Sequence, residues 1–337
     1  MKNLLKLSIA AVAVCGITAS AGTLENVKSA GVLKCGVSTG LPGFAEVGAD
    51  KQWKGLDVDV CKSVAAAVLG DASKVKIVPL TAKERFTALQ SGEIDVLSRN
   101  TTWTQSRDTS LGVNFAGVNY YDGQGFLVST KLGVNSAKQL DGASVCITAG
   151  TTTELNLADY FSANNMTYKP ITYDTAAQVR KGFEAGRCDL ITSDASQLYA
   201  IRTQLAAPKT YKVLPEIISK EPLGPLVRQG DDVWFNIVKW SLNALKTAEE
   251  FGITSANVDY MAANAKVPEV KRLLGTDGSL GKNLNLDAKW AYRIIKSVGN
   301  YGESFERNVG MSSPLEISRG QNALWKDGGL QYSPPFR

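Results

Sequence analysis

Hydroxyl and amide side chains crowd into residues 97–108, directly after a short apolar run, and an arginine follows them. The run 94–97 has the composition of a buried strand, so Asn100 and Thr102 fall near its carboxyl end, where open α/β sheets place their ligands. Arg107 adds a planar cation that can hold a carboxylate through two parallel hydrogen bonds. The stretch therefore predicts a site for a small carboxylate, with a capped helix and a surface ion pair as the alternative.

A second polar turn, Gly150-Thr151-Thr152, follows another apolar strand and opens an amphipathic helix. The free backbone N–H groups and the positive dipole end of such a helix attract a carboxylate. Thr151 and Glu154 also have the spacing of a capping box, which satisfies the helix start without a ligand. Thr151 and Thr152 are therefore candidate binding residues with a structural alternative.

Asp194 ends the apolar run 188–193 and is the acid best placed to meet an ammonium group. Its alternative role is to cap the helix expected at 195–202. Together with Arg107 and the helix start at Thr151, it describes a site for a zwitterion, whose two buried charges must both be paired. That demand argues against sugars, most metals and apolar molecules as ligands.

The segments around these residues alternate between strand-like and helix-like patterns, and the alternation runs through twice. Residues 89–100 also align with 183–194, which places Asn100 over Asp194. We therefore expect an α/β chain of two lobes, each built on a βαβαβ sheet with flanking helices, with the ligand cleft between the lobes. The expected strands are 32–37, 75–80, 94–98, 144–148, 166–173 and 188–193, and the expected helices are 57–69, 82–91, 152–162 and 176–185.

The chain is expected to cross between the lobes, and to bend on closure, near 120–128 and 222–228. The expected divisions are 22–122 for the first part of lobe 1, 123–225 for lobe 2, and 226–337 for the completion of lobe 1 and a carboxyl-terminal helical extension. Helix-like stretches occur there at 232–247, 255–263, 286–298 and 318–326, before an extended strap at 328–337. Four tryptophans of these stretches are expected in the core: Trp234, Trp240, Trp290 and Trp325.

The first 21 residues have the pattern of a secretory signal peptide. Two lysines precede an apolar run at 7–17, and an Ala-Ser-Ala triplet predicts cleavage between Ala21 and Gly22. The apolar run is shorter than the ~18 residues of a membrane-spanning helix, so the protein is expected to be exported. Cys15 offers lipidation as an alternative, although the residue before it is larger than a lipoprotein signal usually has.

Four cysteines remain after the signal peptide, and an exported chain with an even number of cysteines is expected to form disulfides. Their spacing fits no zinc or redox motif, and neither a metal nor a cofactor is expected. Of the three possible pairings, Cys35 with Cys61 and Cys146 with Cys188 are favoured, because each pair joins neighbouring elements of one lobe.

The formal charge of +5 loses two units with the lysines of the signal peptide and is modest for 337 residues. Neither nucleic acid nor an anionic membrane is therefore expected as a partner, and the chain is expected to be a monomer. It contains no histidine, which removes the commonest general base and the Ser-His-Asp triad. We accordingly expect a binding protein and not an enzyme.

The polar strand ends and the helix start described above resemble those of the family 3 periplasmic solute-binding proteins, which deliver polar amino acids to ABC importers. Within that family the chain is most similar to the general L-amino acid-binding proteins. The motifs that carry the resemblance are Thr-x-x-Arg at 104–107 after a hydroxyl-rich strand end, Gly-Thr-Thr at 150–152, and Asp194. The resemblance implies a two-lobed periplasmic binding protein of type II, located in the periplasm. It also implies an L-amino acid as ligand and an inner-membrane ABC permease as partner.

The resemblance further implies a role for each motif residue. Arg107 would clamp the α-carboxylate of the ligand, and Asp194 would bind its α-amine. Asn100 and Thr102 would donate or accept hydrogen bonds beside them, and the threonines of the helix start would close over the carboxylate. Arg85 stands where related binders of acidic amino acids carry an arginine that reaches a side-chain carboxylate; its alternative is a solvated helix arginine.

Two departures from the family pattern concern the shape of the pocket. Relatives often carry an aspartate and an aromatic residue near the first strand, where this chain has Ser38 and Leu41, with Phe44 three residues further on as the candidate ring. A second wall position falls on Ala82, a small residue. Fewer shape-defining side chains predict a roomy pocket and a broad range of polar L-amino acids. The alternative is an exported enzyme similar to cyclohexadienyl dehydratase on the same fold, which would need a further acid or lysine for proton transfer.

Overall fold

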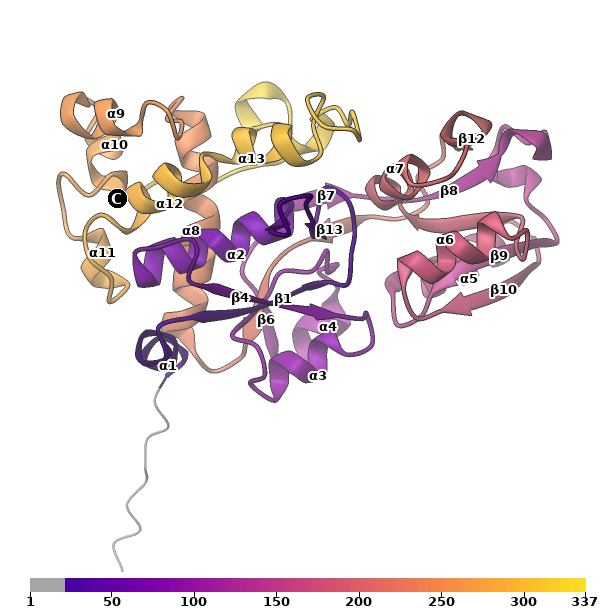
Figure 1. Ribbon diagram of the computed structural model, residues 1–337, viewed down its shortest axis with the longest axis horizontal. Helices are drawn as coiled ribbons and strands as arrows, with labels where there is room; N and C mark the ends of the chain where they lie inside the picture. The colour runs from indigo at the N-terminus through magenta and orange to yellow at the C-terminus, as the bar shows by residue number, and fades with distance from the viewer. Residues whose placement is uncertain (1–21) are drawn as a thin grey trace, which may run out of the picture.

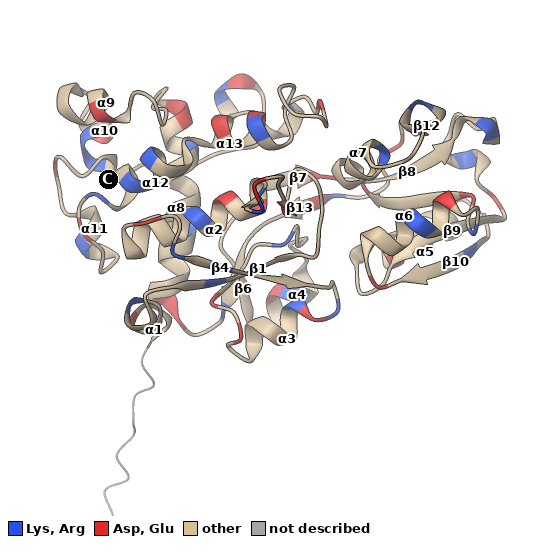
Figure 2. Cartoon of the chain, viewed as in Figure 1, with Lys and Arg blue, Asp and Glu red and all other residues tan. Residues whose placement is uncertain are grey.

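The computed structural model describes residues 22–337, and the expected signal peptide lies outside these residues. Two lobes lie side by side and are joined by strands that cross between them (Figure 1). Within 22–337 no helix is long and apolar enough to cross a membrane. Basic and acidic residues are interspersed along the chain in both lobes (Figure 2).

A five-stranded sheet forms the core of lobe 1, with its strands in the order β4 (Val75–Leu80), β1 (Leu33–Ser38), β5 (Val96–Leu97), β14 (Leu226–Arg228) and β6 (Val113–Phe115). β1 pairs in parallel with β4 and β5, whereas β14 runs antiparallel to β5 and β6. The other elements of this lobe are α1 (Thr23–Ala30), the hairpin β2 (Glu46–Val47) and β3 (Trp53–Lys54), α2 (Leu56–Leu69), α3 (Arg85–Gln90), α4 (Gln105–Ser110) and α8 (Asp232–Glu250).

Lobe 2 repeats this plan with a sheet in the order β10 (Tyr168–Tyr173), β9 (Ala143–Thr148), β11 (Leu190–Asp194), β8 (Gln124–Ser129) and β12 (Tyr211–Val213). The first three strands are parallel, and β8 is antiparallel to β11 and β12. Its helices are α5 (Thr152–Ala163), α6 (Ala176–Glu184) and α7 (Ala195–Thr203), with short 3₁₀ turns η1 (Thr130–Leu132), η2 (Ala137–Gln139) and η3 (Pro208–Thr210). The two-lobed α/β architecture expected from the repeated pattern is confirmed.

Two short strands form the connection between the lobes. β7 (Tyr120–Asp122) and β13 (Glu221–Leu223) pair antiparallel, with Glu221 opposite Asp122. The free edge of β13 is held by lobe 1, since Thr102 forms a β-bridge with Leu223. We call this pair of strands, β7 and β13, the hinge. The carboxyl ends of β5 and β11 lie on either side of it.

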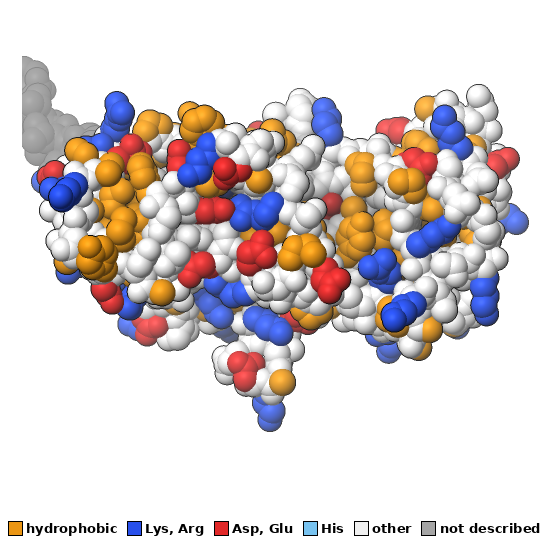
Figure 3. Space-filling view, turned by 90° about the horizontal axis from the view of Figure 1, so that it is seen from above, with side chains coloured by type: hydrophobic (Ala, Val, Ile, Leu, Met, Phe, Trp, Pro, Cys, Tyr) orange, Lys and Arg blue, Asp and Glu red, His pale blue; other side chains and the backbone are white. Residues whose placement is uncertain are grey.

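The carboxyl-terminal extension packs on the helical side of lobe 1, and its apolar residues join those of α2 and α8 in one core. Figure 3 shows that exposed apolar side chains also gather at this end of the molecule, where Tyr260 and Val267 are exposed. The elements of the extension are α9 (Val258–Asn264), α10 (Pro268–Leu273), α11 (Leu280–Asn283), α12 (Trp290–Val298), α13 (Tyr301–Asn308), η4 (Gly320–Asn322) and η5 (Trp325–Asp327).

Residues 318–326 do not form the expected helix, because the backbone is extended at Ala323 and Leu324, which separate the two short 3₁₀ turns η4 and η5. Trp325 is accordingly 51% exposed, and its indole N–H donates to Glu250 at 3.2 Å, so the expectation of a core position is wrong. Trp234 and Trp290 are buried as expected, and Trp240 is partly buried against the same core.

Both favoured disulfides are formed, one in each lobe. Cys35 of β1 is joined to Cys61 of α2, and Cys146 of β9 is joined to Cys188 just before β11. Each bond ties a central strand to a neighbouring element of its own lobe, and neither crosses the hinge.

Candidate functional site

The segments that follow β5 and β11 line one small enclosed cavity between the lobes. Its volume is about 30 Å³. The predicted site residues lie on its wall with two exceptions, Arg107 and Phe44. The wall is made by Ser38, Thr39, Arg85, Arg99, Asn100, Thr102, Thr148, Thr151, Thr152, Thr153, Ala176, Ser193, Asp194 and Gln197.

The lobes touch at several points around this cavity. Lys83 Nζ of lobe 1 lies 2.7 Å from a carboxylate oxygen of Asp174 in lobe 2. The hydroxyl oxygens of Thr102 and Thr152 are 3.4 Å apart across the cleft. These contacts explain the small volume, so an amino acid requires the lobes to move apart before it can enter.

Arg85 and Arg99 form a basic wall on the lobe 1 side. Arg99 donates its Nε–H to the carbonyl of Leu80 at 2.9 Å, and Arg85 donates to Thr101 Oγ1 at 3.3 Å. Burial lowers the pKa of Arg99 to about 10 and holds the pKa of Arg85 well below its ordinary value, with the neighbouring guanidinium of Arg99 adding to the effect. Both groups nevertheless stay cationic at neutral pH, as arginine does in proteins.

Neither of these guanidinium groups forms an ion pair within the described chain, and the Nε of Arg85 is buried without a hydrogen-bond partner. A buried cation without a counter-ion is costly, so this wall favours an anionic partner. Arg99 was not among the predicted site residues, although it lies inside the stretch that suggested a carboxylate site.

Arg107 lies behind this wall and does not line the cavity. Its guanidinium donates to the carbonyl of Thr102 at 3.0 Å and lies over the ring of Phe86, 5.3 Å from the ring centroid. Burial lowers its pKa, while the negative charges of Glu221 and Asp194 oppose this. In this arrangement of the lobes, Arg107 supports the backbone of the strand end, and Arg85 and Arg99 present the positive charge.

Asp194 supplies negative charge from the lobe 2 side. Its side chain is 4% exposed and accepts one hydrogen bond, from Gln197 Nε2 at 2.8 Å. It does not cap α7, because no backbone N–H of that helix donates to its carboxylate. Burial raises its pKa well above the ordinary value, and the neighbouring carboxylates of Asp122 and Glu221 raise it further.

Asp122, at the lobe 2 end of β7, adds a second, partly buried acid that interacts electrostatically with Asp194. It accepts hydrogen bonds from the backbone N–H of Gly123 at 2.9 Å and from the Ser196 hydroxyl. Burial raises its pKa to about 6 in spite of these donors. Of these two acids only Asp194 lines the cavity, and its negative charge favours a cationic group of the ligand.

The start of α5 is left open toward the cavity. Thr151 directs its hydroxyl to the carbonyl of Thr148 at 2.8 Å, and no side-chain cap forms at this helix start. Glu154 accepts from the N–H of Gly150 at 2.9 Å instead of completing a capping box with Thr151. The structural alternative is thus not realised, and the first-turn N–H groups can contribute to anion binding.

Asn100 lies at a sharp bend after β5, with φ +31°. Its backbone N–H donates to Asp57 Oδ2 at 2.8 Å, which fixes the bend, and its side-chain oxygen is buried without a partner. Burial raises the pKa of Asp57 to about 6. An unpaired acceptor on the cavity wall suits a ligand that donates hydrogen bonds.

Phe44 does not reach the cavity. It is 1% exposed in the core of lobe 1, where its ring meets Tyr120 edge-on with centroids 5.4 Å apart. Ser38 and Thr39 stand at the cavity wall instead. The predicted aromatic surface is therefore absent from the wall, which is polar.

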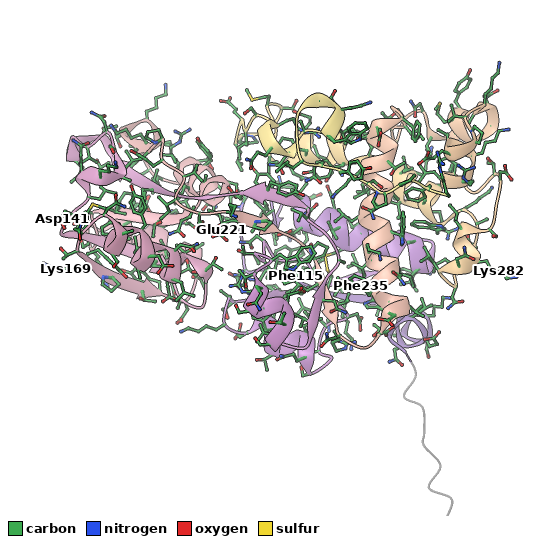
Figure 4. All side chains as sticks on the ribbon, turned by 180° about the vertical axis from the view of Figure 1, so that it is seen from behind. Phe115, Asp141, Lys169, Glu221, Phe235 and Lys282 are labelled. Atoms are coloured by element: carbon green, nitrogen blue, oxygen red, sulfur yellow. A yellow bond between two sulfur atoms is a disulfide. The ribbon has the colours of Figure 1, made fainter. Side chains whose placement is uncertain are left out.

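Glu221 is a functional candidate that no sequence motif indicated. It belongs to β13 and lies between the two lobes (Figure 4). Its carboxylate is fixed by Thr102 of lobe 1 and by Thr152 of lobe 2, two residues of the cavity wall. Thr102 is 119 positions and Thr152 is 69 positions away from Glu221 in the chain, so short-range sequence patterns do not indicate these contacts.

Comparisons with known proteins agree with this geometry. The family model described as bacterial extracellular solute-binding proteins, family 3, matches residues 33–256. The chain is 58% identical to the general L-amino acid-binding periplasmic protein AapJ of Rhizobium johnstonii, over 100% of both chains. It is 56% identical to the glutamate/glutamine/aspartate/asparagine-binding protein BztA of Rhodobacter capsulatus, over 98% of both chains.

A solved structure is also similar to this chain. It is an ABC transporter periplasmic binding protein from Brucella ovis with glutathione bound, 57% identical in sequence, with a TM-score of 0.92. The match covers 94% of this chain and 100% of that one. On the matched family model and these relatives, the chain belongs to the bacterial extracellular solute-binding proteins, family 3.

Proposed function

We propose that this protein captures L-amino acids as zwitterions between its two lobes and delivers them to the permease of an ABC importer. The observation that carries the proposal is the pair of buried guanidinium groups, Arg85 and Arg99, opposite the buried carboxylate of Asp194 on one cavity. None of the three is in an ion pair within the described residues. A ligand with a carboxylate at one end and an ammonium group at the other pairs both charges at once.

The proposed orientation follows from where each charge lies. The ligand carboxylate lies against Arg85 and Arg99, with N–H groups of the α5 start closing over it. The ammonium group lies against Asp194 and donates to the free oxygen of Asn100. The polar wall, with no aromatic clamp, supports a range of polar L-amino acids, and the relative AapJ is named as a general L-amino acid-binding protein.

Lobe movement is part of the proposed cycle. Since the cavity has a volume of about 30 Å³, an amino acid enters while the lobes are apart, and closure then excludes water. The closed pair of lobes is the form that we propose the permease recognises.

Isothermal titration calorimetry with L-glutamate, L-glutamine, L-leucine, L-histidine and L-arginine tests the proposal directly. We expect several of these amino acids to bind. Glutathione is titrated as a further candidate ligand, because a similar protein was solved with it bound. Binding of a single amino acid would refute the broad range, and binding of none would refute the function. Turnover of arogenate or prephenate by the purified protein would instead support the dehydratase alternative.

Export is the remaining part of the proposal. The family is extracellular, and we propose that the signal peptide is removed between Ala21 and Gly22 and that the mature protein works in the periplasm as a monomer. The intact mass of protein secreted by a Gram-negative host should correspond to a chain that begins at Gly22. A mass that includes lipid on Cys15 would contradict this.

A further inference from the structure

The carboxylate of Glu221 is 1% exposed and accepts four side-chain hydrogen bonds. One oxygen accepts from the hydroxyls of Thr102, at 2.5 Å, and Thr152, at 3.0 Å. The other accepts from Asn156 Nδ2 at 2.6 Å and from the Ser219 hydroxyl at 2.8 Å. The donors therefore come from lobe 1, from helix α5 of lobe 2, and from the hinge itself.

This arrangement exists only while the lobes are close together. Lobe 1 holds its donor next to β13 through the β-bridge between Thr102 and Leu223. Thr152 and Asn156 belong to the first turns of α5, which moves with lobe 2. When the lobes separate, Glu221 has to lose its donors from one lobe, and a buried carboxylate that loses donors is destabilised.

We propose that Glu221 is a latch that stabilises the closed arrangement and positions the two threonines at the cavity wall. It acts through Thr102 and Thr152 and is a positioning residue, not a direct ligand contact. This inference rests on the proposed function, because the closed arrangement matters only if ligand is held between the lobes.

The latch also fixes what the two hydroxyls can offer a ligand. A threonine hydroxyl has one proton, and Thr102 and Thr152 both direct theirs to Glu221. Toward the cavity each hydroxyl can therefore only accept a hydrogen bond. Glu221 thus assigns these two positions to donor groups of the ligand, such as an ammonium or amide N–H, and leaves the carboxylate to Arg85 and Arg99.

The test replaces Glu221→Gln, with Glu93→Gln as the matched control on an exposed loop of lobe 1. The amide group of the glutamine turns one acceptor into a donor that faces the Asn156 amide, so the latch is broken at nearly constant volume. We expect the dissociation rate of L-glutamate in stopped-flow fluorescence to rise ~10-fold in E221Q, with little change in the association rate. Wild-type dissociation in E221Q would overturn the proposal.

A second readout does not require any ligand. Dyes on cysteines introduced at Lys76 of lobe 1 and Lys169 of lobe 2, both exposed, report the separation of the lobes by energy transfer. The ligand-free E221Q protein should show more of the separated form than the wild type, and E93Q should match the wild type. Equal distances in E221Q and wild type would contradict the latch, while failure of every amino acid to bind the wild type would contradict the proposed function instead.

If E221Q does not fold, Asn156→Ala tests the same contact from a partly exposed helix position. It removes the 2.6 Å donor and leaves the charge of Glu221 in place. We expect N156A to separate the lobes and speed dissociation in the same direction as E221Q. Unchanged separation and dissociation in N156A would also refute the latch.

Discussion

Replacing Asp194 by asparagine should weaken ligand binding and stabilise the ligand-free protein at the same time. The amide keeps the size of the side chain and the hydrogen bond with Gln197, but removes the negative charge that meets the ligand ammonium. Breaking one side of a buried charge pair costs ~3 kcal/mol or more, which corresponds to a loss of affinity of about 100-fold.

The gain in stability has the same origin. In the ligand-free protein Asp194 is buried beside Asp122 and Glu221 with no cation bonded to it, and its pKa is raised for that reason. Exchanging such a group for a neutral one should therefore increase the free energy of unfolding by about 1 kcal/mol at pH 7.

Calorimetric titration with L-glutamate and thermal unfolding followed by circular dichroism measure the two effects. Asp159→Asn, on the exposed side of α5, is the matched control and should change neither quantity. If D194N bound L-glutamate as tightly as the wild type, the assignment of Asp194 to the ammonium group would be refuted. A fall in melting temperature would show that the negative charge of Asp194 does not destabilise the ligand-free protein.

Three further predictions concern charge and pH. The raised pKa of Asp194 should fall when an ammonium group binds beside it, so ligand binding should release protons and weaken as the pH is lowered. Calorimetric titration in buffers of different ionisation enthalpy measures the number of protons released. The D194N protein should release fewer protons than the wild type. The pKa of Asp57 is raised from 3.8 to about 6, so its stabilising effect is complete below pH 3.8 and is lost as the pH rises to about 6. The free energy of unfolding of D57N minus that of the wild type, measured by urea unfolding, should accordingly increase by up to ~3 kcal/mol as the pH rises from 3.8 to about 6. A difference that does not change with pH would contradict the raised pKa of Asp57. Arg85→Met should weaken binding of L-glutamate by ~100-fold without destabilising the ligand-free protein, and an unchanged Kd would show that Arg85 is not part of the carboxylate site.

The architecture could be predicted from sequence because it depends on local patterns. Apolar strands of about six residues alternate with amphipathic helices twice, and polar residues at strand ends are placed on the cleft by the geometry of parallel sheets. Asn100, Thr102 and Asp194 reach the cavity wall for this reason. The cysteine pairs followed from the same order of elements.

Side-chain direction could not be predicted in the same way. The bend at Asn100 depends on the hydrogen bond to Asp57, which is distant in the chain, and the neighbouring Arg99 lies on the cavity wall. Arg107 instead donates to the backbone of Thr102 behind the wall. The role of Glu221 could not be predicted from the sequence either, because Thr102 and Thr152, which donate to it, are far away in the chain. Phe44 was placed at the site by analogy, whereas packing against Tyr120 holds it in the core.

A crystal structure of the protein with L-glutamate would show where each end of the ligand lies relative to Arg85, Arg99 and Asp194. We expect the ligand ammonium within hydrogen-bond distance of Asp194 and a ligand carboxylate within hydrogen-bond distance of the Arg85 or Arg99 guanidinium. A ligand bound in the opposite orientation, or bound outside the space between the lobes, would contradict this expectation.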